Sequence, residues 1–228
     1  MKITFFNLIV AGLVSCTTIT MAQNQMLNDN QGKPVMEQSY TDVEGSPYLA
    51  ENWLPGIVNL ASGKTIVTKL KYDAVSDELI FQSPRDSMAL AFVSPVKSFR
   101  LDVASIDQSS LTPLLFSSGY PPIDEQTEAS FYQVVATGKT TLLKRYKKVI
   151  HSEQAFNSAT TTKTFAMRDV VYYLLAGNKI VRIKPTLKTI TTMLNDNSGN
   201  LQTFIKSNKI DFKSDNDLAK LFTYFNSL

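Results

Sequence analysis

The feature that most constrains the fold is a series of short β-favouring runs, separated by turn residues, that extends from residue 56 to about residue 184. The clearest pair comprises residues 56–60 and 64–72, which Ala61-Ser62-Gly63 joins in a pattern typical of a hairpin. Further runs cover residues 78–82, 88–93, 96–103, 131–136, 141–150, 164–167, 170–175 and 179–183. About ten short strands with short connections predict a curved or barrel-like antiparallel β-sheet.

A helical pattern replaces the strand pattern after Pro185. Leu187, Ile190 and Leu194 recur at helical spacing, and Ser214-Asp215-Asn216-Asp217 resembles a capping box that opens a last helix. Amphipathic helices must bury their apolar face, and the sheet is the simplest surface on which to bury it. The sequence therefore predicts an α+β fold in which a C-terminal group of two or three α-helices follows the sheet.

The chain divides into a leader, a polar segment and one domain. Residues 23–44 contain too few apolar side chains to offset the entropy of ordering, so we expect a flexible polar lead-in. Residues 45–228 are expected to form a single α+β domain, β-rich over 45–184 and helical over 185–228. Within this domain, residues 105–129 contain three prolines and are predicted to form a long loop.

Residues 1–22 have the pattern of a secretory signal peptide. Lys2 precedes an apolar stretch that is too short to span a bilayer as a stable helix. Small residues at positions 20 and 22 favour cleavage after Ala22, which would leave Gln23 as the first residue. Alternatively, Leu13-Val14-Ser15-Cys16 resembles a bacterial lipobox, in which Cys16 would carry the lipid. The two interpretations exclude each other, and we favour cleavage after Ala22.

Both interpretations predict an exported protein, either periplasmic or associated with the outer membrane. No later segment approaches the roughly 20 apolar residues that a membrane helix requires, so we expect no transmembrane span in the mature chain.

The composition excludes several kinds of site. One cysteine and one histidine cannot build a disulfide framework or a multi-thiolate or multi-histidine metal site. Glycines are never closer than seven residues apart, so neither G-x-G-x-x-G nor G-x-S-x-G occurs. Gly138-Lys139-Thr140 and Gly63-Lys64-Thr65 resemble the end of a phosphate-binding loop, but each lacks the first glycine and precedes a strand-like run. We therefore expect no nucleotide and no cofactor.

Carboxylates occur in loose groups that could support a hydrolase. Asp73 and Asp77 flank one turn, while Asp124 and Glu125 follow the prolines of the predicted loop. Two carboxylates brought together by folding can hydrolyse a glycosidic bond, and His151 is the one histidine that could serve as a base. Turns also favour Asp for local hydrogen bonding, so a carboxylate site requires that these residues converge.

The charge distribution is uneven along the chain. Residues 23–138 carry seven Lys and Arg against fourteen Asp and Glu, whereas residues 139–228 carry fifteen against six. The most basic stretch, which contains no acidic residue, comprises Lys139, Lys144, Arg145, Lys147 and Lys148. These cations could bind an anionic partner such as lipid head groups or an acidic glycan. We favour two simpler explanations, namely that they protect an edge strand or pair with the acidic part of the chain.

Four groups of residues carry a resemblance to a known family. They are Gly45-Ser46-Pro47-Tyr48-Leu49; Lys71-Tyr72-Asp73 with Asp77-Glu78-Leu79-Ile80-Phe81; Phe131-Tyr132 with Gly138-Lys139 and Leu142-Leu143-Lys144; and residues 204–210 with Asp217-Leu218, Lys220-Leu221 and Tyr224-Phe225-Asn226. Together they resemble an uncharacterised family of exported proteins from Bacteroidota. The resemblance implies an envelope location and supplies no activity or catalytic residue.

Three functions are consistent with these features. The first is a non-enzymatic binding or scaffold protein of the cell envelope, whose partner is an envelope protein, a lipid or an acidic glycan. The second is a periplasmic carrier of lipid or lipoprotein with a half-open apolar cavity. A roomy apolar interior of the sheet would favour the carrier, whereas a filled interior would favour the binding or scaffold protein. The third is a carboxylate-based hydrolase. The export signal argues against nucleic acid as a partner.

Overall fold

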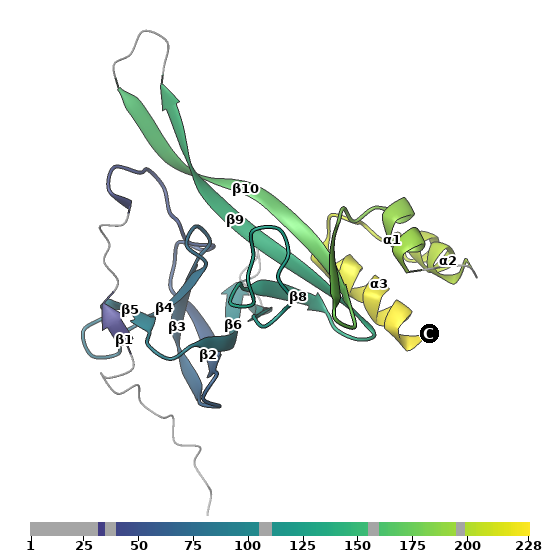
Figure 1. The fold of residues 1–228 in the computed structure, drawn as a ribbon, viewed down its shortest axis with the longest axis horizontal. Coiled ribbons are helices and arrows are strands. Elements are labelled where there is room, and N and C mark those ends of the chain that lie inside the picture. Colours follow the sequence, from purple (N-terminus) through teal and green to yellow (C-terminus); the bar gives the residue numbers. More distant parts are fainter. Residues whose placement is uncertain (1–31, 35–39, 105–110, 155–159, 195–198) are drawn as a thin grey trace, which may run out of the picture.

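The structure is a computed structural model that describes residues 32–34, 40–104, 111–154, 160–194 and 199–228. The described residues form an 11-stranded sheet followed by three helices (Figure 1). The strands are β1 (Gly32–Pro34), β2 (Leu54–Leu60), β3 (Thr65–Asp73), β4 (Glu78–Gln82), β5 (Ala89–Phe92), β6 (Val96–Ala104), β7 (Leu111–Ser117), β8 (Tyr132–Ala136), β9 (Thr140–Gln154), β10 (Thr161–Ala176) and β11 (Lys179–Ile183). The helices are α1 (Leu187–Met193), α2 (Asn200–Ser207) and α3 (Asp215–Ser227).

The sheet is antiparallel and open. Its order is β1-β5-β4-β3-β2-β6-β7-β8-β9-β10-β11, and among the described residues no pairing joins β1 to β11. These observations confirm the predicted α+β class, with a large antiparallel sheet and a C-terminal group of helices. The sheet does not close into a barrel.

Three strands differ from the sequence prediction, and one of them, β1, lies in the segment predicted to be a flexible lead-in. β7 lies inside the segment predicted to be a long loop and pairs with β6 along its whole length. Only Phe116 and Ser117 of β7 also pair with β8, so the strand around Pro113 is an edge, where a sheet tolerates proline. The runs predicted over 164–167 and 170–175 form one strand, β10, which carries an irregularity between Met167 and Asp169.

The N-terminal half of the sheet has a filled core. Tyr72, Phe99 and Phe116 are almost fully buried, and the rings of Phe99 and Phe116 stack with their centroids 4.7 Å apart. The aliphatic side chains of β2, β3 and β4 complete this cluster. Interlocking aromatic and aliphatic groups fill the centre of this half. A pocket of about 460 Å³ lies at its margin, beside Phe92, Val96 and Phe131.

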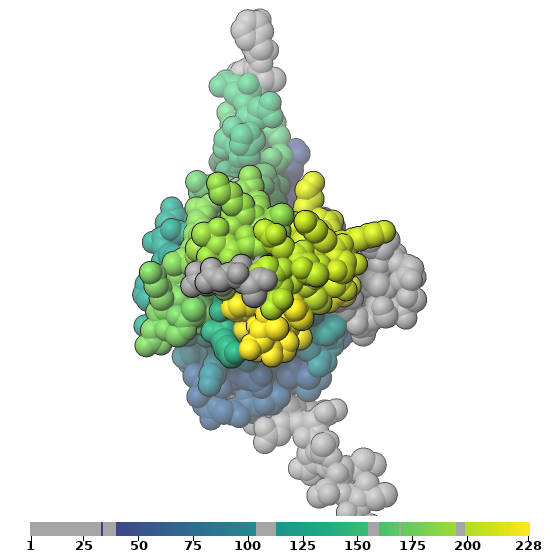
Figure 2. Space-filling view, turned by 90° about the vertical axis from the view of Figure 1, so that its right-hand side faces the viewer, coloured from purple at the N-terminus to yellow at the C-terminus, as the bar shows by residue number. Residues whose placement is uncertain are grey.

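The helices cover the other end of the sheet, where they gather beside β8 to β11 (Figures 1 and 2). Leu218, Leu221 and Phe222 of α3 are fully buried in a cluster that includes Leu142 of β9 and Leu174 of β10. Ser214 caps α3 as predicted, because its Oγ accepts a hydrogen bond from the backbone N–H of Asp217 at 3.3 Å. Among the described residues, no helix has the length and apolar character needed to cross a membrane.

A long hairpin projects from the body of the molecule (Figure 1). It consists of residues 149–154 of β9 and 161–167 of β10, which we call the arm. One edge of the arm is bound near its base, because Glu44 exchanges backbone hydrogen bonds with Lys163 and Phe165. Residues 40–44 of the predicted lead-in thus contact the domain, and β1, also in that segment, pairs with β5.

Candidate functional site

A large cavity lies between the C-terminal end of the sheet and the segments that connect the helices. Its volume is about 1120 Å³, which is at the upper end of the size of small-molecule sites in proteins. Its apolar walls come from three places in the chain: Val170 and Tyr172 of β10, Ile183 of β11 with Leu187 of α1, and Ile210 with Phe212 of the α2–α3 connection. We call this cavity the helix cleft.

The alternation of β10 and the register of the sheet place the first of these walls. Val170 and Tyr172 are two residues apart, so their side chains stand on the same face of β10. Tyr172 is the direct partner of Ile183 across the β10–β11 pair, which brings Ile183 onto that face. The α2–α3 connection places Ile210 and Phe212 against the cleft from the helical side.

A polar cluster holds the start of α3 beside the cleft. Lys144 Nζ lies 2.5 Å from Asp215 Oδ2, and the Tyr172 hydroxyl donates to Asp215 Oδ1 at 2.8 Å. Burial alone would lower the pKa of Lys144, but its interactions with Asp215 and Tyr146 together outweigh burial and raise that pKa above its usual range. Burial, together with the bond to Asp215, raises the pKa of Tyr172 to about 12. Because Asp215 is the first residue of α3, the cluster fixes this helix to the sheet and also suits the helix dipole.

The charged residues that line the helix cleft are predominantly cationic. Lys144, Arg182, Lys184 and Lys213 contribute to the lining, against the single acidic residue Asp211. Lys184 and Lys213 are exposed, and no ion pair engages either of them within the part of the chain that the structure describes. The cleft therefore combines apolar walls with unneutralised positive charge at its margin.

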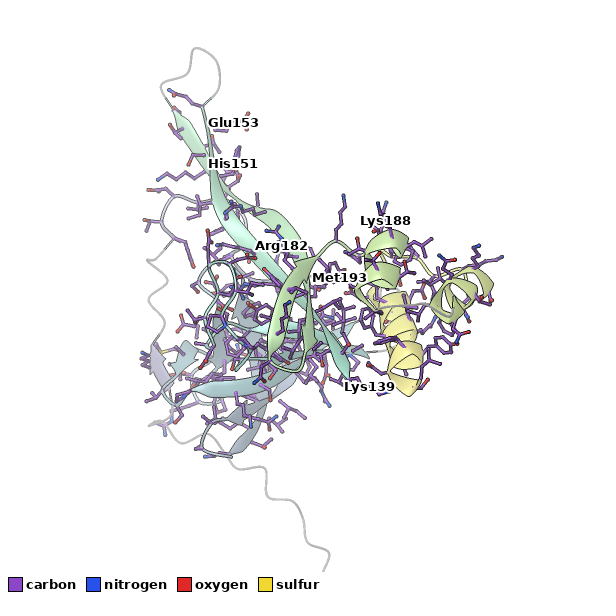
Figure 3. All side chains as sticks on the ribbon, turned by 45° about the vertical axis from the view of Figure 1, so that its right-hand side comes forward. Lys139, His151, Glu153, Arg182, Lys188 and Met193 are labelled. Carbon is purple, nitrogen blue, oxygen red and sulfur yellow. The ribbon has the colours of Figure 1, made fainter. Side chains whose placement is uncertain are left out.

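The five cations that the sequence singles out do not form one patch. Side chains alternate along β9, so Lys144 faces the helix cleft whereas Arg145 and Lys147 line a smaller pocket of about 220 Å³ on the other face. Lys139 is exposed in the β8–β9 turn, before β9 begins (Figure 3). Lys148 donates to the backbone carbonyls of Ser46 and Tyr48 at 2.8 and 2.6 Å.

Arg145 joins the two halves of the sheet from a buried position. Its Nη2 lies 2.9 Å from Asp77 Oδ2, and its Nη1 donates to the carbonyl of Phe131 at 2.9 Å. The second oxygen of Asp77 accepts the Tyr72 hydroxyl at 2.6 Å, and burial followed by the charge of Asp77 raises the pKa of Tyr72 well above its usual value. The basic part of the chain thus pairs with the acidic part here, as Lys147 also does with Glu125 at 2.6 Å.

The carboxylates that the sequence offers for a hydrolase do not converge with His151. Asp73 accepts hydrogen bonds from the Tyr40 hydroxyl and the backbone N–H of Val75, and Asp124 accepts one from the Tyr173 hydroxyl. His151 is exposed on the arm, at the opposite end of β9 from Lys139 (Figure 3). Over the described residues, no group of three or more His, Cys, Asp or Glu side chains is placed to hold a metal ion.

Three predicted residues lie outside the described part of the chain. They are Cys16, Ala22 and Gln23, so the choice between lipidation and cleavage stays a sequence prediction.

The residues of the helix cleft were not predicted as a site. Val170, Tyr172 and Ile183 read as ordinary strand residues, and Ile210 and Phe212 as apolar positions near a helix. The alternation of Ile210 and Phe212 with Asp211 and Lys213, in a segment between two helices, was the available signal.

The chain matches no protein-family model, and comparison with curated proteins and with solved structures finds no significant similarity.

Proposed function

We propose that the protein is a non-enzymatic binding protein of the cell envelope, which carries an apolar or amphiphilic molecule in the helix cleft. The observation that carries this proposal is the cleft itself, a cavity of about 1120 Å³ with apolar walls on both sides. A cavity of this kind is the usual setting for a ligand of low polarity. The helix cleft is larger than the pocket of about 460 Å³ beside Phe92 and Phe131 in the N-terminal half, and lysines accompany its apolar walls.

The location in this proposal rests on the sequence. Residues 1–22 have the pattern of a signal peptide, and the resemblance to exported Bacteroidota proteins points to the same compartment. The carrier is either free in the periplasm after cleavage before Gln23, or tethered to the outer membrane through a lipidated Cys16. The intact mass of the mature protein distinguishes these two forms.

A neutral fluorescent probe tests the proposed binding. N-phenyl-1-naphthylamine becomes fluorescent in apolar sites, so we expect a saturable increase on titration into the full mature chain. The variant Val170→Trp, which fills the cleft from β10, should lose that increase. Val67→Trp is the matched control, because Val67 is 65% exposed on β3 and does not line the cleft. Equal binding by both variants would contradict the proposal.

The arm supports a second candidate, in which the protein binds another envelope protein as a scaffold. Ile150 and Met167 are large apolar side chains that are 40% and 43% exposed on the arm. A hairpin that projects with exposed apolar side chains is a plausible contact surface. Replacing both residues by Glu should abolish co-purification of a protein partner while leaving probe binding intact.

A further inference from the structure

We propose that the ligand of the helix cleft is an amphiphile with an oxyanion head group, whose tail lies between the apolar walls while Lys184 and Lys213 bind the head. This inference rests on the proposed function and names the chemical class of the ligand. It is argued from the position and the pairing of the charges around the cleft.

The two lysines stand where the apolar walls end. Lys184 follows Ile183 directly and Lys213 follows Phe212 directly, and both lysines line the cleft together with these two wall residues. The two segments come from opposite sides of the cleft, one from the end of β11 and the other from the α2–α3 connection. A ligand whose tail lies between Ile183 and Phe212 would therefore have its head near two positive charges.

These lysines differ from Lys144 in their availability. Lys144 is neutralised by Asp215 at 2.5 Å and serves to position α3. Lys184 and Lys213 are exposed, and among the described residues neither is engaged in an ion pair. A flexible ammonium group that is not committed to a carboxylate can follow an oxyanion and donate several hydrogen bonds to it.

The acidic residue of the lining offsets only part of this charge. Asp211, whose Oδ1 accepts the backbone N–H of Lys213 at 2.9 Å, keeps its negative charge but is a single anion beside two exposed lysines. Arg182 also contributes to the lining, from the edge strand β11, and adds a further positive charge near the cleft. The net charge around the cleft therefore favours an anionic head over a neutral or cationic one.

A pair of probes with the same tail tests the head group. The first is 11-(dansylamino)undecanoic acid, which carries a carboxylate at neutral pH, and the second is its uncharged methyl ester. At low ionic strength we expect the acid to bind the full mature protein about tenfold more tightly than the ester, because each exposed charge contact adds only a few-fold. Raising the salt concentration should reduce this ratio.

A double variant then assigns the effect to the two lysines. In Lys184→Ser/Lys213→Ser, the acid should bind no more tightly than the ester, while the affinity of the ester stays as in the wild type. The control Lys139→Ser/Lys179→Ser makes the same change in net charge at two exposed lysines that do not line the cleft, and it should keep the tenfold preference.

The outcomes separate the two proposals. Equal binding of acid and ester to the wild type would overturn the anionic head group and leave the apolar carrier standing. A preference that survives in Lys184→Ser/Lys213→Ser, or is lost equally in the control, would also overturn it. Binding of neither probe would overturn the carrier itself.

Discussion

Replacement of Arg145 tests how the two halves of the sheet are held together. The variant Arg145→Ala leaves the carboxylate of Asp77 without its cation and the carbonyl of Phe131 without its donor, in a site where the Arg145 side chain is only 10% exposed. Breaking a buried ion pair on one side costs about 3–5 kcal/mol, which is a large part of the roughly 5–15 kcal/mol that stabilises a domain. We therefore expect the free energy of unfolding to fall by about 3–5 kcal/mol.

Urea unfolding followed by circular dichroism measures this loss. For a dependence on urea of about 2 kcal/mol per molar, the midpoint should fall by roughly 1.5–2.5 M. Lys147→Ala is the matched control, since Lys147 lies two residues away on the same face of β9 and pairs with Glu125, which is 71% exposed. An exposed pair contributes about 0–1 kcal/mol, so this variant should unfold nearly as the wild type does.

A double variant tests whether the loss comes from the charge that is left unpaired. Asp77→Asn/Arg145→Met removes both charges together, and Asn is among the residues that tolerate the positive φ of 63° at position 77. It should therefore be less destabilised than Arg145→Ala alone. If Arg145→Ala costs less than about 1 kcal/mol, no more than Lys147→Ala, then the pair does not join the halves and the reasoning is refuted.

Three further predictions concern single side chains. The Tyr132 hydroxyl is buried with no partner among the described residues, so Tyr132→Phe should keep or raise the melting temperature. The Tyr173 hydroxyl donates a hydrogen bond to Asp124, so Tyr173→Phe should lower the melting temperature. Asn226 of α3 makes three hydrogen bonds to Thr137 and Thr140, at the β8–β9 turn. Asn226→Ala should therefore lower the free energy of unfolding by about 1–3 kcal/mol and speed the hydrogen exchange of backbone amides in α3. Unchanged exchange in α3 would contradict this prediction. Burial raises the pKa values of Tyr132 and Tyr172 to about 12, so ionisation of these groups is disfavoured in the fold. Their titration should leave the free energy of unfolding unchanged below pH 10 and lower it as the pH rises from 10 to 12, and a flat profile over this range would contradict the prediction.

The sequence predicts the fold better than the site, for physical reasons. Alternation, turns and the Ser214 cap are local, and they locate most strands and the start of α3. β7 is missed because Pro113 suggests a loop, and only the pairing with β6 makes an edge strand acceptable there. Whether the curved sheet would close also depends on contacts between distant strands, which a local pattern does not contain.

The basic stretch shows why local sequence patterns do not predict the candidate site. The period of two in a strand already separates Lys144 from Arg145 and Lys147, so a single patch on β9 is not expected from alternation. Their partners, however, come from residues 14 to 71 positions away along the chain, and no spacing rule reveals them. The helix cleft is hidden for the same reason, because its walls meet only when the α2–α3 connection packs beside β10 and β11.

Native mass spectrometry tests the central claim, that the helix cleft holds a ligand, most directly. Wild-type protein and Val170→Trp would be purified from the same cells without detergent and measured intact, then denatured. We predict that the wild type retains an additional mass that is lost on denaturation, and that Val170→Trp lacks it. A bare mass for the wild type, or the same adduct in both proteins, would contradict the account.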